Sequence, residues 1–352
     1  MAEDQDLRSD TKNTTTFRMS GKMFIVVATF LEGTNQETFD DIARVGGSIQ
    51  GCKLLHVGAD TVPDNTIYTL AGKEEPVSEA LIAMSKRAAE SIDVSQRTDT
   101  KIGLGVLDLC AVSPYGDSTM DDCVKLSRTL GEKLAKEFDI PVYLLWESAT
   151  REDLRSLPPI KCRKVAGFTE RIQHDDPWKK PDYGTATFNQ KWCATLIGAQ
   201  KFTPVFNVNL TTTDLKVVQE VCYLVRTSGR PKQREQHGDL PAVKATAWIS
   251  QIAPVGQVAM FLLNTDVTGL HRAYEACRRR GQELQTDVVS SEVVGMIPLK
   301  VMLEAASSCM SREEFDEASE EKKIKTVIEC LGLDKMRRFD PKTRILEYAI
   351  RD

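Results

Sequence analysis

The sequence predicts an α+β protein in which helices pack on mostly antiparallel sheets. Segments with the apolar pattern of strands are interleaved with segments that keep one apolar helical face. Several neighbouring strand segments are joined by connections too short for the crossovers that parallel strands require. The chain has 352 residues, which is enough for about two domains with a hydrophobic core in each.

The first half of the chain alternates strand and helix patterns. One helix is expected over Asn35–Val45, and a second begins at Pro76, because proline suits the first turn. A third helix follows the capping pair Ser118-Thr119. The strands predicted in this half are Lys22–Phe30, Cys52–Val57, Ile67–Leu70, Lys101–Val112 and Pro141–Trp146.

The second half repeats this alternation. Thr213–Thr227 has a helical pattern that stops near Gly229, and two adjacent strand patterns, Val243–Ile252 and Gln257–Leu263, predict a hairpin. The other elements predicted here are a strand over Asp287–Val294 and helices over Val267–Leu284, Pro298–Ser307 and Ser311–Cys330.

The stretch from Gly184 to Leu210 lies at the centre of this organisation. Its residue pattern favours a helix, then a tight packing turn at Gly198-Ala199, then a strand. Two asparagines of that strand, Asn207 and Asn209, alternate with apolar residues, as on a strand with one buried face. The aromatic rings earlier in the stretch suit either core packing or the walls of a site for a flat ligand.

Composition narrows the function. The net charge of -5 argues against nucleic-acid binding, and no apolar run is long enough to span a bilayer. Residues 1–21 are polar and lack the apolar core of a signal peptide, so we expect a disordered tail. The nine cysteines form no CxxC pair and indicate reduced thiols in the cytosol. The four histidines are scattered, so no metal site is predicted.

A series of motifs resembles the formiminotransferase family, the folate-dependent enzymes of histidine breakdown. The segment WCATLIGAQKFTPVFNVNL is similar to the family's WGAT-x-x-GA-R-KF…FN-x-NL. VATFLEGTNQ, LLHVGADTVPDNTIYTLAG, VLDLCAVSPYGDSTMDDCV and DPKTRILEY also have counterparts in the family, in the same order. The resemblance runs from about Met23 to the C-terminus, and the sequence holds no counterpart of the cyclodeaminase domain of the bifunctional members.

This resemblance implies a fold and a reaction. The fold would be two ferredoxin-like α/β-sandwich subdomains with mostly antiparallel sheets, residues 22–200 and 201–352. They would meet near Gly198–Phe202 around a cleft that holds Trp192 and Lys101, in a homodimer. The family reaction moves a formimino group from N-formimino-L-glutamate to N5 of tetrahydrofolate, so tetrahydrofolate is the implied ligand or substrate.

The resemblance also assigns a substrate-binding segment. The family's folate motif G-P-S-S-F-x-P-S-W-G corresponds here to Gly184, Thr185, Ala186, Thr187, Phe188, Asn189, Gln190, Lys191, Trp192 and Cys193. The glycine, the phenylalanine and the tryptophan are retained, and Lys191 could meet the glutamate tail of a folate.

The family's catalytic residues are replaced. Its histidine, suited to proton transfer because its pKa lies near neutrality, is Lys101 here, and the arginine two residues later is Gly103. An ordinary lysine has a pKa of about 10.4, so little of it is a free base at neutral pH. Lys101 is either a solvated strand-end lysine or, if burial lowers its pKa, a substitute base.

Other polar positions of the family have changed as well. His56 and Gly58 replace two aspartates, Gln200 replaces an arginine and Phe261 an asparagine. His56 is either a hydrogen-bonded structural residue or a relocated base. Since the core positions persist, the pattern indicates a retained fold with weak or lost catalysis.

Three interpretations follow. The chain is an active transferase with an altered proton route, an inactive relative that still binds folate, or a structural or partner-binding protein that kept only the fold. Titration with tetrahydrofolate and a formimino-transfer assay separate them.

Overall fold

A computed structural model describes residues 21–60, 65–96, 103–156, 168–170, 172, 178, 180–185, 189, 191–231, 237–250 and 252–351, except for the side chains of residues 59 and 60. The predicted disordered tail lies almost wholly outside the described residues. None of the described helices is long and apolar enough to cross a membrane.

The first half of the chain forms a six-stranded sheet in the order β2-β3-β1-β4-β6-β5. Strands β2, β3, β1 and β4 pair antiparallel, and β6 pairs parallel to both β4 and β5. The strands are β1 (Lys22–Phe30), β2 (Cys52–Asp60), β3 (Asn65–Gly72), β4 (Leu107–Gly116), β5 (Val142–Trp146) and β6 (Thr195–Ala199).

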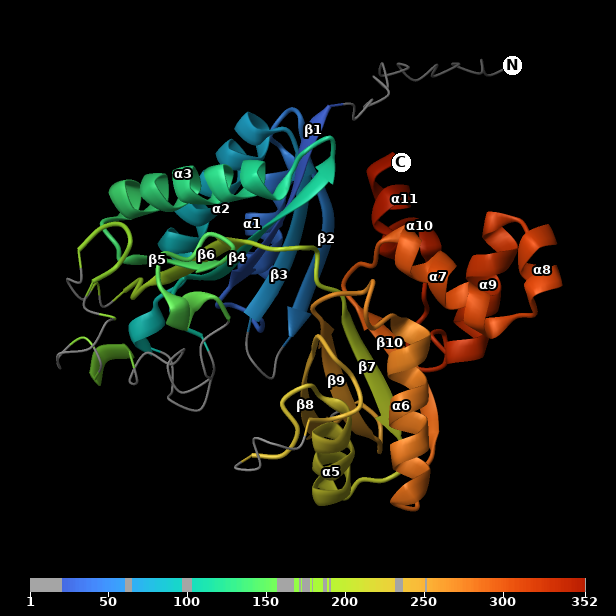
Figure 1. Cartoon of the computed structure of the whole chain (residues 1–352). Helices are drawn as coiled ribbons and strands as arrows, with labels where there is room; N and C mark the ends of the chain where they lie inside the picture. The colour runs from blue at the N-terminus through green and yellow to red at the C-terminus, as the bar shows by residue number, and fades with distance from the viewer. Residues whose placement is uncertain are drawn as a thin grey trace, which may run out of the picture.

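Three helices pack on one face of this sheet (Figure 1). They are α1 (Gln36–Gly47), α2 (Glu74–Ser91) and α3 (Met120–Phe138), and two short 3-10 turns lie at Val94–Gln96 and Glu152–Leu154. The sequence β1-α1-β2-β3-α2-β4, with the strand order β4-β1-β3-β2, is the ferredoxin-like arrangement.

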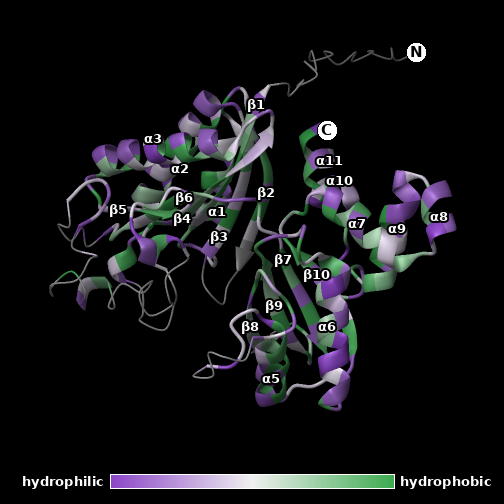
Figure 2. Cartoon of the chain, viewed as in Figure 1, coloured by the Kyte–Doolittle hydropathy of each residue, from purple (hydrophilic) through white to green (hydrophobic). Residues whose placement is uncertain are grey.

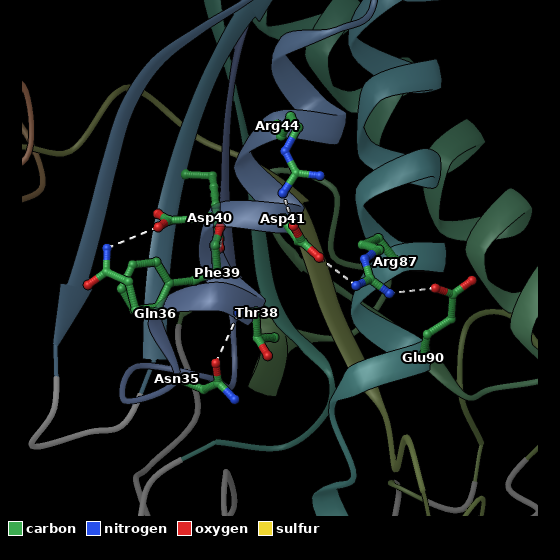
Figure 3. Close-up of polar contacts among 10 residues, drawn as sticks. Asn35, Gln36, Thr38, Phe39, Asp40, Asp41, Arg44, Arg87 and Glu90 are labelled. Atoms are coloured by element: carbon green, nitrogen blue, oxygen red, sulfur yellow. Dashed lines mark hydrogen bonds and ion pairs between the residues drawn. The ribbon is translucent and has the colours of Figure 1, made fainter.

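Polar contacts cap α1 and link it to α2 (Figure 3). The Asn35 side chain caps α1 by accepting a hydrogen bond of 3.1 Å from the backbone N–H of Thr38. Arg87 of α2 reaches Asp41 of α1 at 2.5 Å and Glu90 of its own helix at 2.7 Å. The Arg87–Asp41 ion pair thus joins α1 to α2, which share the apolar core beneath them.

The second half of the chain repeats the same arrangement with a four-stranded antiparallel sheet in the order β10-β7-β9-β8. Its elements are β7 (Val205–Leu210), α5 (Leu215–Val225), β8 (Val243–Ile249), β9 (Gly256–Leu262), α6 (Leu270–Glu283) and β10 (Val288–Val294). Figure 2 shows hydrophilic and hydrophobic residues interleaved along α3 and α6, as expected of amphipathic helices that cover a sheet.

Five further helices follow the second sheet. They are α7 (Leu299–Cys309), α8 (Arg312–Glu317), α9 (Glu320–Leu331), α10 (Pro341–Arg344) and α11 (Leu346–Arg351). The single helix predicted over Ser311–Cys330 is wrong, because the chain is extended at Ala318 and restarts at Ser319. The Ser319 hydroxyl accepts a hydrogen bond from the backbone N–H of Lys322 and so caps α9.

A third apolar cluster joins the two halves. Ile25 and Ala71 of the first sheet pack against Met296, which follows β10, and against Leu346 and Ile350 of α11. The Lys53 Nζ of β2 also donates to the Ile350 carbonyl at 3.4 Å. The last helix of the chain therefore rests on the first sheet, on the face opposite α1, α2 and α3 (Figure 1).

The α+β fold class predicted from the sequence is confirmed, and one central prediction is wrong. Residues predicted as a helix and a packing turn form strand β6, which includes Gly198 and Ala199. A Cβ atom at Gly198 would collide with the Leu145 carbonyl of β5, so glycine permits the close approach of these two strands. The strand predicted over Lys101–Val112 begins only at Leu107 in the structure, and residues 101 and 102 lie outside the described residues.

Candidate functional site

Trp192, predicted to wall a ligand site, lies in the hydrophobic core of the first half. Its side chain is 3% exposed and stacks on Phe138 of α3, with ring centroids 4.4 Å apart. The indole Nε1–H donates to Thr195 Oγ1 at 3.0 Å, and that hydroxyl donates to the Leu107 carbonyl at 2.8 Å. With its ring face and its donor both occupied, Trp192 has a packing role in this structure and does not line an open cleft.

The rest of the predicted substrate-binding segment is a tight loop where it is described. The Asn189 side chain accepts hydrogen bonds from the backbone N–H groups of Lys191 and Trp192, at 3.1 and 3.0 Å. Gly184 has φ +77°, and a Cβ there would collide with the Ile140 carbonyl. Thr185 and Lys191 are exposed. The other members of the segment, Ala186, Thr187, Phe188 and Gln190, lie outside the described residues.

Cys193 follows this loop and is fully buried with φ +72°. Burial, reinforced by the nearby Asp108 carboxylate, raises the pKa of its thiol. The backbone N–H of Cys193 donates to the Asn189 carbonyl at 2.7 Å. A protonated, buried thiol is a core filler and a poor nucleophile.

Lys101, at the position of the family's histidine, lies outside the described residues, but its neighbourhood does not. Gly103 has φ +150°, and a Cβ there would collide with the buried side chain of Leu31. A short distance along the chain, Asp108 is 4% exposed, and its Oδ1 accepts a 2.6 Å hydrogen bond from the backbone N–H of Leu104. This backbone favours glycine at position 103 and leaves no room there for an arginine stem.

His56 and Gly58, which replace two family aspartates, lie on the same face of β2. A Cβ at Gly58 would lie 2.8 Å from Nε2 of His56, so the imidazole takes the space a side chain at position 58 would need. Burial, followed by the positive charge of Arg344, lowers the pKa of His56 to about 4. The ring is therefore neutral at neutral pH.

Arg344, a residue of the second half of the chain, acts electrostatically on His56 in the first half. Its guanidinium donates to the Gly295 carbonyl at 3.0 Å, directly after β10. Burial, together with the positive charge of Arg337, lowers the pKa of Arg344, and the Glu292 carboxylate opposes this shift. Arg337 lies 3.9 Å from Glu292 of β10. Arg344, Arg337 and Glu292 thus place charged groups along the junction between the two halves.

The second sheet carries amide side chains on the face opposite α5 and α6, here called the open face. Asn209 of β7 donates to Ser290 Oγ at 2.9 Å and accepts from Gln257 Nε2 at 2.8 Å. Gln257 of β9 also donates to Glu292 at 3.0 Å and accepts from Trp248 Nε1 at 2.7 Å. Both asparagines of β7 are buried, so the expectation of a strand with one buried face is wrong.

One amide of the open face is incompletely bonded. Asn207 is 6% exposed, and its Oδ1 has no hydrogen-bond partner among the described residues. On the same face, Trp248 and Phe261 are each 40% exposed. A buried acceptor beside exposed aromatic rings can bind a flat ligand that carries hydrogen-bond donors. The alternation of Asn207 and Asn209 was the sequence signal for this face.

Three further side chains that carry metal-binding atoms lie close together and were not predicted from the sequence. His271, Cys309 and Cys330 offer ligand atoms that all lie within 4.8 Å of one another. These residues are far apart in the sequence and come from three helices, so no ligand spacing could reveal them.

The class of protein is shown by family models that cover both ferredoxin-like units. The N-terminal subdomain of the Formiminotransferase domain matches residues 23–200, and the Formiminotransferase domain matches residues 205–351. The chain belongs to this family.

Its relatives include two kinds of protein. Formimidoyltransferase-cyclodeaminase of Rattus norvegicus is 36% identical over 93% of this chain and 59% of its own length, and that of Dictyostelium discoideum is 31% identical over 94% and 61%. Glutamate formimidoyltransferase of Streptococcus pyogenes serotype M1 is 28% identical over 84% of this chain and 95% of its own length. The chain thus spans about three fifths of the cyclodeaminase-bearing relatives it matches.

Proposed function

We propose that the chain is a folate-binding, formiminotransferase-like protein in which formimino transfer is weak or lost. Family membership supports the ligand class, with tetrahydrofolate and N-formimino-L-glutamate as the compounds to test. In the family reaction, the bond between the formimino carbon and the glutamate nitrogen breaks as a bond to N5 of tetrahydrofolate forms. N5 loses a proton and the glutamate nitrogen gains one, so a positioned acid–base group is required.

The conformation at Gly103 is the observation that carries the catalytic part of this proposal. At the position of the family's arginine, the backbone has φ +150° and the Leu31 side chain fills the space a Cβ would take. The arginine is therefore replaced by a backbone and a packing arrangement adapted to its absence. Since Lys101 stands at the position of the histidine, both the proton acceptor and the neighbouring cation of the family are changed together.

The open face supports the binding part. The Oδ1 atom of Asn207 is an acceptor without a partner among the described residues and suits a donor of a pterin ring, and Trp248 offers a partly exposed aromatic face for stacking. Asn209 is fully buried and bonded to Ser290 and Gln257, so its role is to hold this face in place. The exposed amino group of Lys191, in the segment that resembles the family's folate motif, is a candidate partner for a glutamate carboxylate.

Two measurements on the purified protein test the proposal. Calorimetric titration with tetrahydrofolate measures binding, and an assay of formimino transfer measures turnover beside a relative that carries the family's histidine. We expect saturable binding with turnover at least about 100-fold below that relative, because general acid–base catalysis is typically worth about 10²–10⁴-fold. Comparable turnover by the two proteins would refute lost catalysis.

Three variants locate the ligand. Trp248→Ala is expected to weaken binding about tenfold, within the range typical of stacking on an aromatic ring. Lys191→Ala tests the folate-motif segment, and Gln282→Ala, an exposed amide on α6, is the matched control. Neither binding nor turnover in the wild type would instead favour the alternative, a non-catalytic structural or partner-binding protein that kept the fold.

The proposal extends to the assembly and setting that the family resemblance implies, a homodimer in the cytosol. Light scattering at several protein concentrations tests the dimer. A monomer at every concentration would contradict it.

A further inference from the structure

Three side chains with metal-binding atoms converge on the helical side of the second half. His271 lies in the first turn of α6, Cys309 is the last residue of α7, and Cys330 lies in the last turn of α9. Their ligand atoms all lie within 4.8 Å of one another. None of the three belongs to the open face or to the folate-motif segment, so the proposed function leaves this cluster unused.

The chemistry of the cluster is that of a soft metal site. Two thiols and an imidazole are ligands that zinc and related cations take in tetrahedral geometry, with metal–sulfur distances of about 2.3 Å and metal–nitrogen distances of about 2.0–2.1 Å. Those distances place tetrahedral ligands about 3.5–4 Å apart. Contraction by about 1.3 Å at most would therefore seat a metal, and rotation of side chains at the helix ends can supply it.

We propose that His271, Cys309 and Cys330 bind a thiophilic divalent cation of the zinc class. Three protein ligands leave one coordination position open for water or for another side chain. Glu275 lies one helical turn after His271 on the same face of α6, but its carboxylate is engaged by Arg278, with contacts of 2.5 to 3.0 Å. Water is the fourth ligand that this arrangement favours.

Bound metal would link three helices. The contact between α7 and α9 is already extensive, and α6 packs on α7. A cation held by one ligand from each helix would fix α6, which covers the second sheet, to the α7–α9 pair. Its free energy of binding would add to the stability of the second half, because the unfolded chain does not hold the three ligands together.

Cadmium titration tests the site directly. The reduced protein, freed of metal with a chelator, is titrated with Cd²⁺ while the ultraviolet thiolate-to-metal charge-transfer band is recorded. We expect about one Cd²⁺ per chain, displaced by Zn²⁺ in competition. The variants Cys309→Ser, Cys330→Ser and His271→Ala should each weaken binding by at least about tenfold.

Two controls keep the result interpretable. His237→Ala removes a different histidine of the second half, one that is exposed, and should leave the titration unchanged. Cys330 is exposed, so Cys330→Ser should melt like the wild type without metal, while only the wild type gains thermal stability on adding Zn²⁺. A fully reduced protein that binds no Cd²⁺, or Cd²⁺ binding that survives both cysteine substitutions, would overturn the proposal.

Discussion

His56 and Gly58 show how two substitutions at one site depend on each other. The imidazole lies on the same strand face as position 58 and fills the space of its missing Cβ. An aspartate could return to position 58 only if the ring moved. The two departures from the family pattern are thus one structural change, in which a pair of carboxylates is exchanged for a single half-buried, neutral ring.

A double-mutant cycle measures this dependence. Gly58→Ala should cost about 1–3 kcal/mol of unfolding free energy in the wild type, because the added methyl group meets His56. In a His56→Ala background the same change should cost much less, which gives a coupling of about 0.5–3 kcal/mol by urea denaturation. Gly47→Ala is the control, since a Cβ there meets only Leu54 at an ordinary 3.8 Å. Equal costs in the two backgrounds would exclude the contact.

The lowered pKa of His56 also predicts a pH dependence. In the unfolded chain the imidazole takes up a proton near its ordinary pKa of 6.5, whereas the folded protein holds it neutral down to about pH 4. Between these values only the unfolded state is protonated, so stability falls as pH falls. Across the whole window the loss is at most about 3 kcal/mol.

The measurement compares wild type with His56→Gln. Urea unfolding at pH 7 and at pH 4 should show a larger loss of stability in the wild type than in the variant. An identical loss in both proteins would mean that another group carries the pH dependence.

At the scale of elements, the sequence predicted the long segments with a clear periodicity, but it did not predict the short apolar strand β6. The capping pair before α3, the hairpin β8–β9 and the helix α6 follow from local sequence, and the structure contains them. The residues of β6 form a run of small and apolar residues that suits either a helix or a buried strand. Their pairing with β4 and β5 is made by distant segments, which no local pattern encodes.

The candidate sites were also predictable only where local sequence carries the signal. The resemblance located the folate-motif segment, and the alternation of Asn207 and Asn209 pointed to a polar strand face. Neither could give the Gln257–Trp248 contacts, because register between strands decides them. The convergence of His271 with two cysteines depends on how helices pack, which is a tertiary property.

Trp192 provides a test at this scale, because it connects the folate-motif loop to β6 and α3. Trp192→Ala removes a buried ring and should cost about 3–5 kcal/mol of unfolding free energy. Trp192→Phe keeps an aromatic ring and loses the donor to Thr195, so it should cost less. Denaturant unfolding measures both, with Trp248→Ala as an exposed tryptophan control. If Trp192→Ala is no more destabilising than the control, the packing role is wrong.

For the whole molecule, the two ferredoxin-like units are separate cores held together by a small shared cluster. The first core and the second core each enclose their own sheet and helices. The third cluster brings Met296 and α11, from the second half of the chain, onto β1 and β3 of the first sheet. The electrostatic contacts of Arg344 with His56 and with Glu292 run beside it. The relative placement of the folate-motif loop and the open face therefore depends on α11.

Ile350→Ala tests this dependence. The side chain is 4% exposed in the third cluster, and its truncation should cost about 2–5 kcal/mol. We expect the wild type to unfold in one calorimetric transition. Because the loss in the variant falls on the contact between two cores, that transition should broaden or separate into two. Leu215→Ala, at a leucine of α5 that is 41% exposed, is the matched control and should leave one sharp transition. A uniform downward shift of one transition in Ile350→Ala would instead mean that the halves unfold together without relying on this cluster.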